Sequence, residues 1–423
     1  MPATFSLTGC DNLMHSFDYE LRRSGYAGNA CQVVLELSAP ISADALRKRV
    51  AELVGKYPIL TAHVGGMFVP QWKLASGQPV MPQVRTHREA AGLREQISNE
   101  PLAMSRGELF RFDLVERADG RMNVIFTWSH ALMDANSAEH FLAVVGREDV
   151  PLPNVERVLP VRKPLTFKER MLIIRKQVGM MDEICKNPPR TVGVRRPEAR
   201  KGLVYRVEKF TAEETQRIRS NGAKLCGVLS DAQFHAASSI MELHQLHERV
   251  GKASPSYVLP VPVGLRPKGN VEPLFTNQVT MLMLQFLPAH LTSIKDAVAA
   301  LKAQTEKGIR SGLVDSGVVL LETFRFMPKP VFLMFLKHGL RGEVCSLFYG
   351  NTAAVSPLVT TFLGATVEDF THVAAITPSP GVGVIFYYFR GMMRLTVLHL
   401  EQHFSTAEID GFAAGLRARL LNP

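Results

Sequence analysis

The sequence WSHALMDAN, residues 128–136, joins a strand-like run to a helix-like one. The preceding run, MNVIFTW, is rich in aromatic and β-branched side chains, which is typical of a β-strand. A helix is expected to begin near Asn136, because Asn136 and Glu139 have the spacing of a capping box. His130 is therefore predicted to lie in a strand-to-helix connection, where a side chain can face a cleft.

The chemistry available to this stretch is that of a general base. The unperturbed pKa of histidine is about 6.5, so a partly buried His130 stays neutral near pH 7 and can accept a proton from a hydroxyl or an amine. Asp134, four residues on, can orient the ring or pair with a distant cation. Taken alone, the two residues are more typical of an ordinary hydrogen-bonded histidine and a helix-capping aspartate.

The surrounding sequence predicts a mixed α/β organisation in two halves. Asp119 and Gly120 supply the turn of a hairpin in the first half, and Arg390 and Gly391 supply that of a hairpin in the second. The predicted strands are residues 30–37, 109–115, 122–128, 204–210, 278–287, 383–389 and 392–400, and the strand at 278–287 is expected to be buried. The predicted helices are a stretch capped by Ser42, residues 211–224 and 231–247, and a last helix from Ser405 to about Leu421.

A basic segment separates the two halves. Residues 165–186 are predicted to form an amphipathic helix, whose apolar seam is Phe167, Met171, Ile174, Val178, Met181 and Cys185. Residues 190–201, RTVGVRRPEARK, form a turn-rich linker. The sequence thus predicts an N-terminal half at 1–164, a basic amphipathic helix and linker at 165–201, and a C-terminal half at 202–423.

The positive charge is concentrated in this region. Residues 157–209 hold 15 basic and 5 acidic residues, an excess equal to the net charge of +10 of the whole chain. A local excess of positive charge attracts anionic partners. We therefore expect the segment to dock an anionic donor substrate or a membrane, with Arg195, Arg196 and Arg200 as docking residues. Its helix can lie on anionic lipid or pack its seam on the protein. The alternative is a solvated linker.

Length and composition exclude several classes of protein. With 423 residues, 46% hydrophobic and 21% charged, the chain is predicted to be globular rather than disordered or collagen-like. Its five cysteines are scattered without a C-x-x-C pair, which argues against a disulfide framework and a zinc knuckle. The start lacks the features of a signal peptide, so we expect a cytoplasmic protein. The most lipid-like run, VFLMFL at 331–336, lies between Lys329 and Lys337 and is expected in the core or in an interfacial patch.

Other chemistries lack their residue patterns. His244 and His247 lie at i and i+3 of a predicted helix without a third ligand nearby, so no metal site is expected. Gly381 and Gly383 lack a third glycine in register, and neither a Walker spacing nor G-x-S-x-G is present, which argues against phosphate loops and serine hydrolases. Residues 190–201 contain no aromatic side chain, so nucleic-acid binding is not expected.

The stretch at 128–136 resembles the H-H-x-x-x-D-G motif of the thioester-dependent acyltransferase superfamily, with Ser129 for the first His and Ala135 for the Gly. That superfamily includes peptide-synthetase condensation domains, chloramphenicol acetyltransferase, wax ester and diacylglycerol synthases, and polyketide-associated acyltransferases. Further resemblances, which extend over most of the chain, are PL at 101–102 leading to FR at 110–111, VPVGLRP at 261–267 with NQV at 277–279, GNT at 350–352 and PSPGVG at 378–383.

The resemblance implies two chloramphenicol-acetyltransferase-like α/β halves with mixed sheets and an active-site tunnel between them. It implies that His130 is the general base and that Asp134 is structural, with Arg266 as its salt-bridge partner across the interface. A bidentate pair suits that role, because two parallel hydrogen bonds fix its geometry. Candidates to hydrogen-bond the oxyanion or the acceptor, each as compatible with plain turn chemistry, are Asn277, Asn351 and Ser356.

The implied activity is direct transfer of an acyl group from a coenzyme A or carrier-protein thioester to a hydroxyl or amine acceptor. No permanently bound cofactor is expected, because acyl-CoA or a phosphopantetheinyl carrier thioester is the co-substrate. One alternative is a free-standing condensation enzyme that joins carrier-bound substrates. Another is a degenerate module that binds a carrier protein or lipid without turnover, which Ala135 favours because its Cβ narrows the space beside His130.

Overall fold

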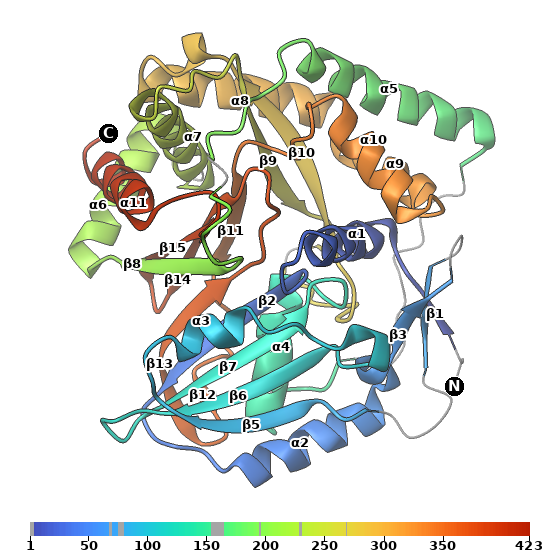
Figure 1. The fold of residues 1–423 in the computed structure, drawn as a ribbon, viewed down its shortest axis with the longest axis vertical. Helices are drawn as coiled ribbons and strands as arrows, with labels where there is room; N and C mark the ends of the chain where they lie inside the picture. The colour runs from blue at the N-terminus through green and yellow to red at the C-terminus, as the bar shows by residue number, and fades with distance from the viewer. Residues whose placement is uncertain are drawn as a thin grey trace.

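A computed structural model describes residues 4–66, 70–74, 80–153, 165–193, 196–227, 231–267 and 269–423. Its largest sheets lie in the lower and upper parts of the molecule in Figure 1, with helix α1 (Gly9–Arg23) between them. Helices pack beside both sheets, so the mixed α/β class is confirmed. No helix among these residues is long and apolar enough to cross a bilayer.

The lower sheet has six strands in the order β12-β13-β2-β7-β6-β5. Its strands are antiparallel except for the parallel pair β5 and β6, so the sheet is mixed. A small sheet, β1-β4-β3, accompanies it. The strand bounds are β1 Thr4–Ser6, β2 Ala30–Leu37, β3 His63–Gly65, β4 Gln71–Lys73, β5 Gln83–Arg88, β6 Phe110–Glu116, β7 Met122–Ser129, β12 Thr361–Phe362 and β13 Ala365–Val373.

The upper part holds a four-stranded sheet in the order β11-β14-β15-β8 and a two-stranded sheet, β10-β9. The strand bounds are β8 Leu203–Lys209, β9 Tyr257–Gly264, β10 Val279–Phe286, β11 Phe348–Ala354, β14 Val382–Phe389 and β15 Met392–Leu400. The remaining α-helices are α2 Ala43–Lys56, α3 Leu93–Ser98, α4 Ala135–Gly146, α5 Phe167–Cys185, α6 Ala212–Cys226, α7 Asp231–Arg249, α8 Ile294–Arg310, α9 Leu313–Phe324, α10 Lys329–His338 and α11 Thr406–Leu421.

One strand from late in the chain crosses between the two parts. β13 follows β11 in sequence, yet it pairs with β2 of the lower sheet, with Phe370 opposite Leu35. The next strand, β14, returns to the upper sheet and pairs with β11 and β15. The C-terminal half of the sequence therefore contributes to both sheets. The division at residues 164 and 201 stays a prediction, and residue 164 lies outside the described ranges.

An aromatic cluster fixes the strand that carries the 128–136 stretch. Phe126 on β7 stacks on Phe112 of β6 and on Trp128, with ring centroids 4.8 Å and 5.2 Å apart. Phe110 on β6 meets Phe141 of α4 edge to face at 5.4 Å. All five rings are buried, and full burial of such a side chain contributes about 1.5–3 kcal/mol. The end of β7 is consequently anchored to both its neighbouring strand and the following helix.

The structure corrects three details of the predicted elements. Helix α4 is capped by Asp134, whose carboxylate accepts the backbone N–H of Ser137 at 3.0 Å, and not by a capping box at Asn136. β10 alternates between buried and half-buried residues, because only one of its faces meets the core. The seam predicted for α5 does not pack along its whole length: Ile174 is buried, whereas Phe167 and Met171 are exposed.

Candidate active site

The His130 loop is held by backbone contacts on both sides. The backbone N–H of His130 donates to Asn29 O at 3.0 Å, and that of Ser129 donates to Leu109 O at 2.8 Å. The Trp128 indole N–H closes the loop by donating to Met133 O at 3.1 Å. These bonds do not use the imidazole, so the ring is presented by a loop that the backbone already fixes.

Asp134 connects this loop to the second half of the chain. Its Oδ1 caps α4, while its Oδ2 accepts from Arg266 Nη1 at 2.6 Å and from the backbone N–H of Gln278 at 2.9 Å. The side chains of Asp134 and Arg266 are only 11% and 9% exposed, so the charge on each needs the other. The structure therefore brings these two predicted partners together across the interface.

The Arg266 guanidinium is not bidentate on the carboxylate, so that expectation is wrong. Its second nitrogen, Nη2, donates instead to Ser137 Oγ at 2.7 Å, to Pro273 O at 3.0 Å and to Thr276 O at 3.2 Å. The fork thus spans the first turn of α4 and the loop before β10. Arg266 therefore ties the start of α4 to this loop rather than contacting one carboxylate alone.

Asn277 holds the His130 loop rather than offering a free donor. Its Nδ2 donates to His130 O at 2.8 Å and to Asp11 Oδ1 at 3.0 Å, and its backbone N–H donates to the same Asp11 oxygen at 2.7 Å. Both amide hydrogens are engaged, so this side chain has none left for an oxyanion. These contacts argue against the predicted oxyanion role of Asn277, and its predicted acceptor-binding role stays a prediction.

The environment of His130 favours its neutral form. Burial lowers the pKa of His130 below its ordinary value of 6.5, although hydrogen bonding to the backbone, the charge of Asp134 and the Asn277 side chain raise it in part. Nδ1 of the ring is buried, as is the remaining amide oxygen of Asn277. A neutral imidazole at pH 7 has a lone pair available to accept a proton.

Comparison with known proteins gives a result only at the level of structure. No protein-family model and no curated protein sequence matches the chain. Over 99% of its length it is similar to TRI3 trichothecene 15-O-acetyltransferase from Fusarium sporotrichioides, with a TM-score of 0.71, 12% identity and 94% of that chain covered. Over 100% of its length it is similar to the first condensation domain of the calcium-dependent antibiotic synthetase, with a TM-score of 0.70, 14% identity and 97% coverage.

This chain has the condensation-domain fold. Polyketide synthase associated protein 5 from Mycobacterium tuberculosis shares it, with a TM-score of 0.64, 14% identity, and coverage of 99% of this chain and 97% of that one. The resemblance to this superfamily is therefore confirmed for the fold. Sequence identities this low establish the fold alone. The chemistry has to be argued from the residues of this chain.

Ala135 fits the condensation-domain fold without backbone strain. It is the first residue of α4, and it is not among the non-glycine residues with positive φ in the described ranges. The position therefore does not require the conformational freedom of glycine in this chain. Ser129, the other departure, is a buried strand-end residue.

The other two predicted oxyanion or acceptor residues lie in the second half of the sequence. Ser356 is anchored to α4, because its backbone N–H donates to Glu139 Oε2 at 2.8 Å. Asn351 on β11 lies 3.3 Å from a ring nitrogen of His235 and 3.4 Å from the Tyr349 hydroxyl. These contacts place both residues without assigning either to the reacting atoms, so their roles stay predictions.

The predicted donor-docking residues differ in their surroundings. Arg196 is half-buried and pairs with Glu408 at 2.8 Å, while its backbone N–H donates to Gln402 O at 2.7 Å. Its charge is thus balanced within the protein. Arg200 is exposed, and Arg195 lies outside the described residues. The docking role of this segment stays a prediction, and Arg200 is the better probe of it.

Sequence reasoning missed two groups that support the site. Asp11 is fully buried and receives Asn277 and the Thr276 hydroxyl, the latter at 3.1 Å from each carboxylate oxygen. Its signal was the spacing of Thr8 and Asp11, which form a capping box at the start of α1. Glu139 and His372 are the second group, a buried pair 2.8 Å apart that joins α4 to β13.

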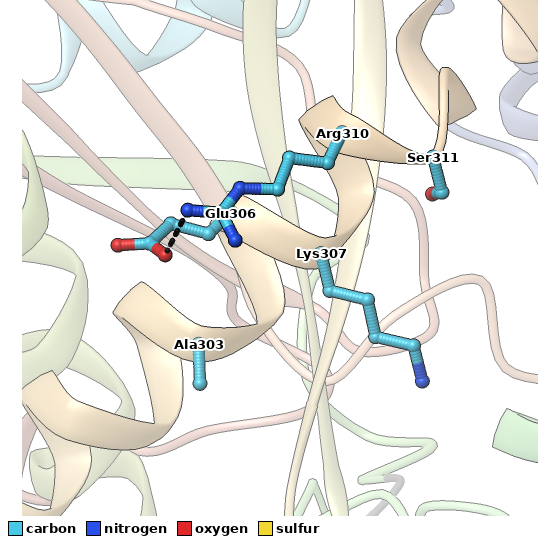
Figure 2. A pocket seen from close by; sticks show the side chains of 5 residues that line it. All are labelled: Ala303, Glu306, Lys307, Arg310 and Ser311. Carbon is cyan, nitrogen blue, oxygen red and sulfur yellow. Dashed lines mark hydrogen bonds and ion pairs between the residues drawn. The ribbon is translucent and has the colours of Figure 1, made fainter.

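Within the part of the chain that the structure describes, the residue clusters outside this interface do not suggest another reaction centre. An open depression of about 540 Å³ lies at the end of α8. Figure 2 shows the side chains that line it, which are Ala303, Glu306, Lys307, Arg310 and Ser311. Its side chains come from a single exposed helix end. Among the described residues no three His, Cys, Asp or Glu side chains are grouped to hold a metal ion. His244 and His247 instead contact the Tyr257 hydroxyl at 2.9 Å and Lys252 O at 2.7 Å.

Proposed function

We propose that this chain is an acyltransferase that moves an acyl group from a coenzyme A or carrier-protein thioester to a hydroxyl or amine acceptor. The observation that carries the proposal is a half-buried imidazole with a lowered pKa, in a loop tied to both halves of the sequence. The condensation-domain fold supports the same class of reaction. Because a condensation domain is among the similar structures, a carrier-bound thioester is included among the donors to be tested.

The reaction needs one proton acceptor and no acyl-enzyme intermediate. His130 removes the proton of the acceptor hydroxyl or amine as that atom attacks the thioester carbonyl carbon. The carbonyl oxygen gains the negative charge of a tetrahedral intermediate, and the carbon–sulfur bond then breaks. The departing thiolate takes the proton from the His130 imidazolium. The products are an ester or amide and a free thiol, and His130 returns to its neutral form.

The residues around His130 act by position. A neutral imidazole carries a proton on one ring nitrogen and leaves the other nitrogen to accept the proton of the acceptor. Asp11 Oδ1 holds Asn277 by accepting from its backbone N–H and from its Nδ2. Asp134 and Arg266 keep the end of the loop against the second half of the chain. We assign the general-base role to His130 and positioning roles to Asn277, Asp134 and Arg266.

Thiol release tests the proposal directly. Acyl-CoA and acyl-phosphopantetheine thioesters of several chain lengths are incubated with panels of alcohols and amines, and free thiol and product mass are recorded. We expect acceptor-dependent thiol release with at least one pair. Release that needs two carrier-bound substrates would assign the chain to the condensation reaction. Binding of a carrier without turnover of any pair would assign it to a non-catalytic module and overturn the proposal.

We predict that no acyl-enzyme accumulates during turnover. Burial raises the pKa of the Cys31 thiol to about 12 and that of Cys345 well above its ordinary value, so these thiols stay protonated and weakly nucleophilic. Ser129 is buried and belongs to the end of a strand. Single-turnover reactions quenched and analysed by intact-protein mass spectrometry should show unmodified chain. A kinetically competent acyl adduct on Ser129 or any cysteine would contradict direct transfer.

We predict that Asn277→Ala lowers kcat by about 10²-fold with little change in KM, because a misplaced base loses its alignment with the acceptor. The pH profile separates positioning from a purely structural role. Activity requires neutral His130, whose pKa lies below 6.5, so the acidic limb of kcat/KM should have its midpoint below 6.5. Asn277 raises that pKa, so its removal should move the midpoint further down.

Thr276→Val is the matched control for this variant. It removes the hydroxyl that donates to Asp11 but leaves the contact between Asn277 and His130 O in place. We expect it to lower stability without moving the acidic limb. Equal midpoints in wild type and Asn277→Ala, or the same displacement in Thr276→Val, would remove Asn277 from the positioning of His130.

A further inference from the structure

Large apolar side chains are exposed on one group of helices. Of the eleven exposed large hydrophobic side chains among the described residues, seven come from the first turns of α5 and from residues 326–335. Phe167, Leu172 and Met334 are 80%, 70% and 64% exposed. The remaining members of this group of seven are Met171, Phe326, Val331 and Phe335. Scattered exposed hydrophobic residues are normal, but this concentration marks an interaction surface.

The helices that carry these side chains contact one another through the middle and the end of α5. The Ser316 hydroxyl, near the start of α9, donates to Gln177 in the middle of α5 at 2.9 Å. Gly339, just after α10, abuts Cys185 at the end of α5, because a Cβ built on Gly339 would lie 2.1 Å from Cys185 Sγ. α10 packs on the end of α9, where the rings of Phe335 and Phe324 are 5.0 Å apart. Figure 1 shows α5, α9 and α10 together at one edge of the molecule.

The same segments are strongly basic. Residues 165–178 contain Lys168, Arg170, Arg175 and Lys176 and a single acidic residue, Glu169. Glu169 is occupied in capping its own helix, since its carboxylate accepts the Thr166 N–H at 2.8 Å. Residues 324–342 contain four basic residues and no acidic one: Arg325, Lys329, Lys337 and Arg341. We call residues 165–178 and 324–342 together the basic apolar surface.

The end of α8 extends this surface. Lys176 of α5 lies beside Gly312, where a Cβ would be 3.9 Å from its Nζ. The adjoining turn presents Ile309, which is 61% exposed, and the exposed Lys307 and Arg310 of the depression in Figure 2. Arg310 pairs with Glu306 at 3.4 Å, whereas Lys307 points away from that pair in Figure 2. Basic and apolar side chains therefore continue past the middle of α5.

We infer that the basic apolar surface binds a membrane that contains anionic lipid. Phe, Leu and Met side chains can enter the headgroup region while Lys and Arg side chains contact lipid phosphates. Protein–protein interfaces are depleted in lysine at their centres, whereas here lysine and arginine alternate with the exposed apolar residues. Three of these eight bases are engaged within the protein, because Lys337 pairs with Glu20, Arg325 pairs with Glu322 and Lys329 contacts His15. The charge still fits an anionic plane best, because Lys168, Arg170, Arg175 and Lys176 lie on the same helix as the exposed apolar residues of α5.

Vesicle sedimentation tests the inference with the full chain. The protein is mixed with vesicles of phosphatidylcholine alone or with about one quarter phosphatidylglycerol, and the bound fraction is measured against lipid concentration. We expect at least tenfold tighter binding to the anionic vesicles, and a loss of affinity as salt rises. Absence of binding, or equal binding to both vesicles, would overturn the inference.

Matched variants locate the surface. Leu172→Glu combined with Met334→Glu should weaken binding to anionic vesicles by at least tenfold, because it removes apolar contact and adds negative charge. Met81→Glu, at an apolar residue that is 43% exposed next to β5, is the control and should bind like wild type. Melting temperatures and thiol release from a water-soluble thioester should be unchanged in both variants.

Two other results would also overturn the inference. If Met81→Glu weakened binding as much as the double variant, the basic apolar surface would not be the contact. If wild type formed dimers in sedimentation velocity without vesicles, and the double variant were monomeric with vesicle binding unchanged, the surface would be a contact between copies of this chain. The vesicle and dimer measurements do not depend on acyl transfer, so their outcome is separate from that of the proposed function.

Discussion

His130→Ala is expected to lower the rate of acyl transfer by about 10²- to 10⁴-fold, the usual contribution of a positioned general base. Folding should survive the change, because the contacts that hold the loop use the backbone N–H and carbonyl of His130, to Asn29 O and from Asn277 Nδ2. The imidazole itself can therefore be removed without breaking them. The measurement is acceptor-dependent thiol release under single-turnover conditions.

The control for this variant is His244→Ala. His244 is half-buried on α7 and contacts the Tyr257 hydroxyl, so its removal changes a histidine of the second half without touching the His130 loop. We expect it to retain the wild-type rate. A His130→Ala rate within a few-fold of wild type, with the same melting temperature, would remove His130 from the mechanism.

Most elements of this fold could be predicted from local patterns. The strand at 30–37, the hairpin turns at Gly120 and Gly391 and the cap at Ser405 each depend on residues close in sequence, and the structure has them at those positions. The path of β13 could not be predicted this way, because its pairing with β2 joins residues more than 300 positions apart. Local periodicity carries no information about which distant strand is the neighbour.

The candidate site divides in the same manner. His130 and Asp134 could be identified because the stretch at 128–136 resembles a known motif, and Arg266 because the stretch at 261–267 resembles another. The predicted start of α4 was wrong by two residues, because aspartate and asparagine both cap helices well and the sequence offers one of each, at 134 and 136. In the structure Asp134 is the cap, and the same carboxylate pairs with the distant Arg266. Asp11 was missed, because its interaction with Asn277 spans 266 residues and its local role as a helix cap explained it sufficiently.

The exposed start of α5 shows a limit of reading amphipathicity. Apolar residues at helical spacing predict a seam that packs on the core, and Ile174 does so. Phe167 continues the same spacing but is 80% exposed, because α9 covers only part of the helix. A sequence pattern identifies the apolar face of a helix, whereas the length of its partner determines how much of that face is buried.

Asp134→Asn is expected to cost about 3–5 kcal/mol of folding stability, because it leaves the Arg266 guanidinium buried without its counter-charge. The side chain of Arg266 is 9% exposed, so water cannot replace the lost carboxylate. The cap of α4 should survive, since asparagine caps helices about as well as aspartate. The loss in urea-unfolding midpoint therefore reports the ion pair rather than the helix end.

The double variant Asp134→Asn with Arg266→Met completes this test. Removing both charges abolishes the unpaired cation, so part of the lost stability should return, and the coupling between the two changes should exceed about 0.5 kcal/mol. Acyl transfer should stay impaired in both variants, because Gln278 N–H and Arg266 no longer hold the end of the His130 loop as in wild type. If Asp134→Asn instead unfolded at the wild-type midpoint, the pair would not hold the two halves together, and the loop would have to be fixed by Asn277 and the backbone contacts of His130 alone.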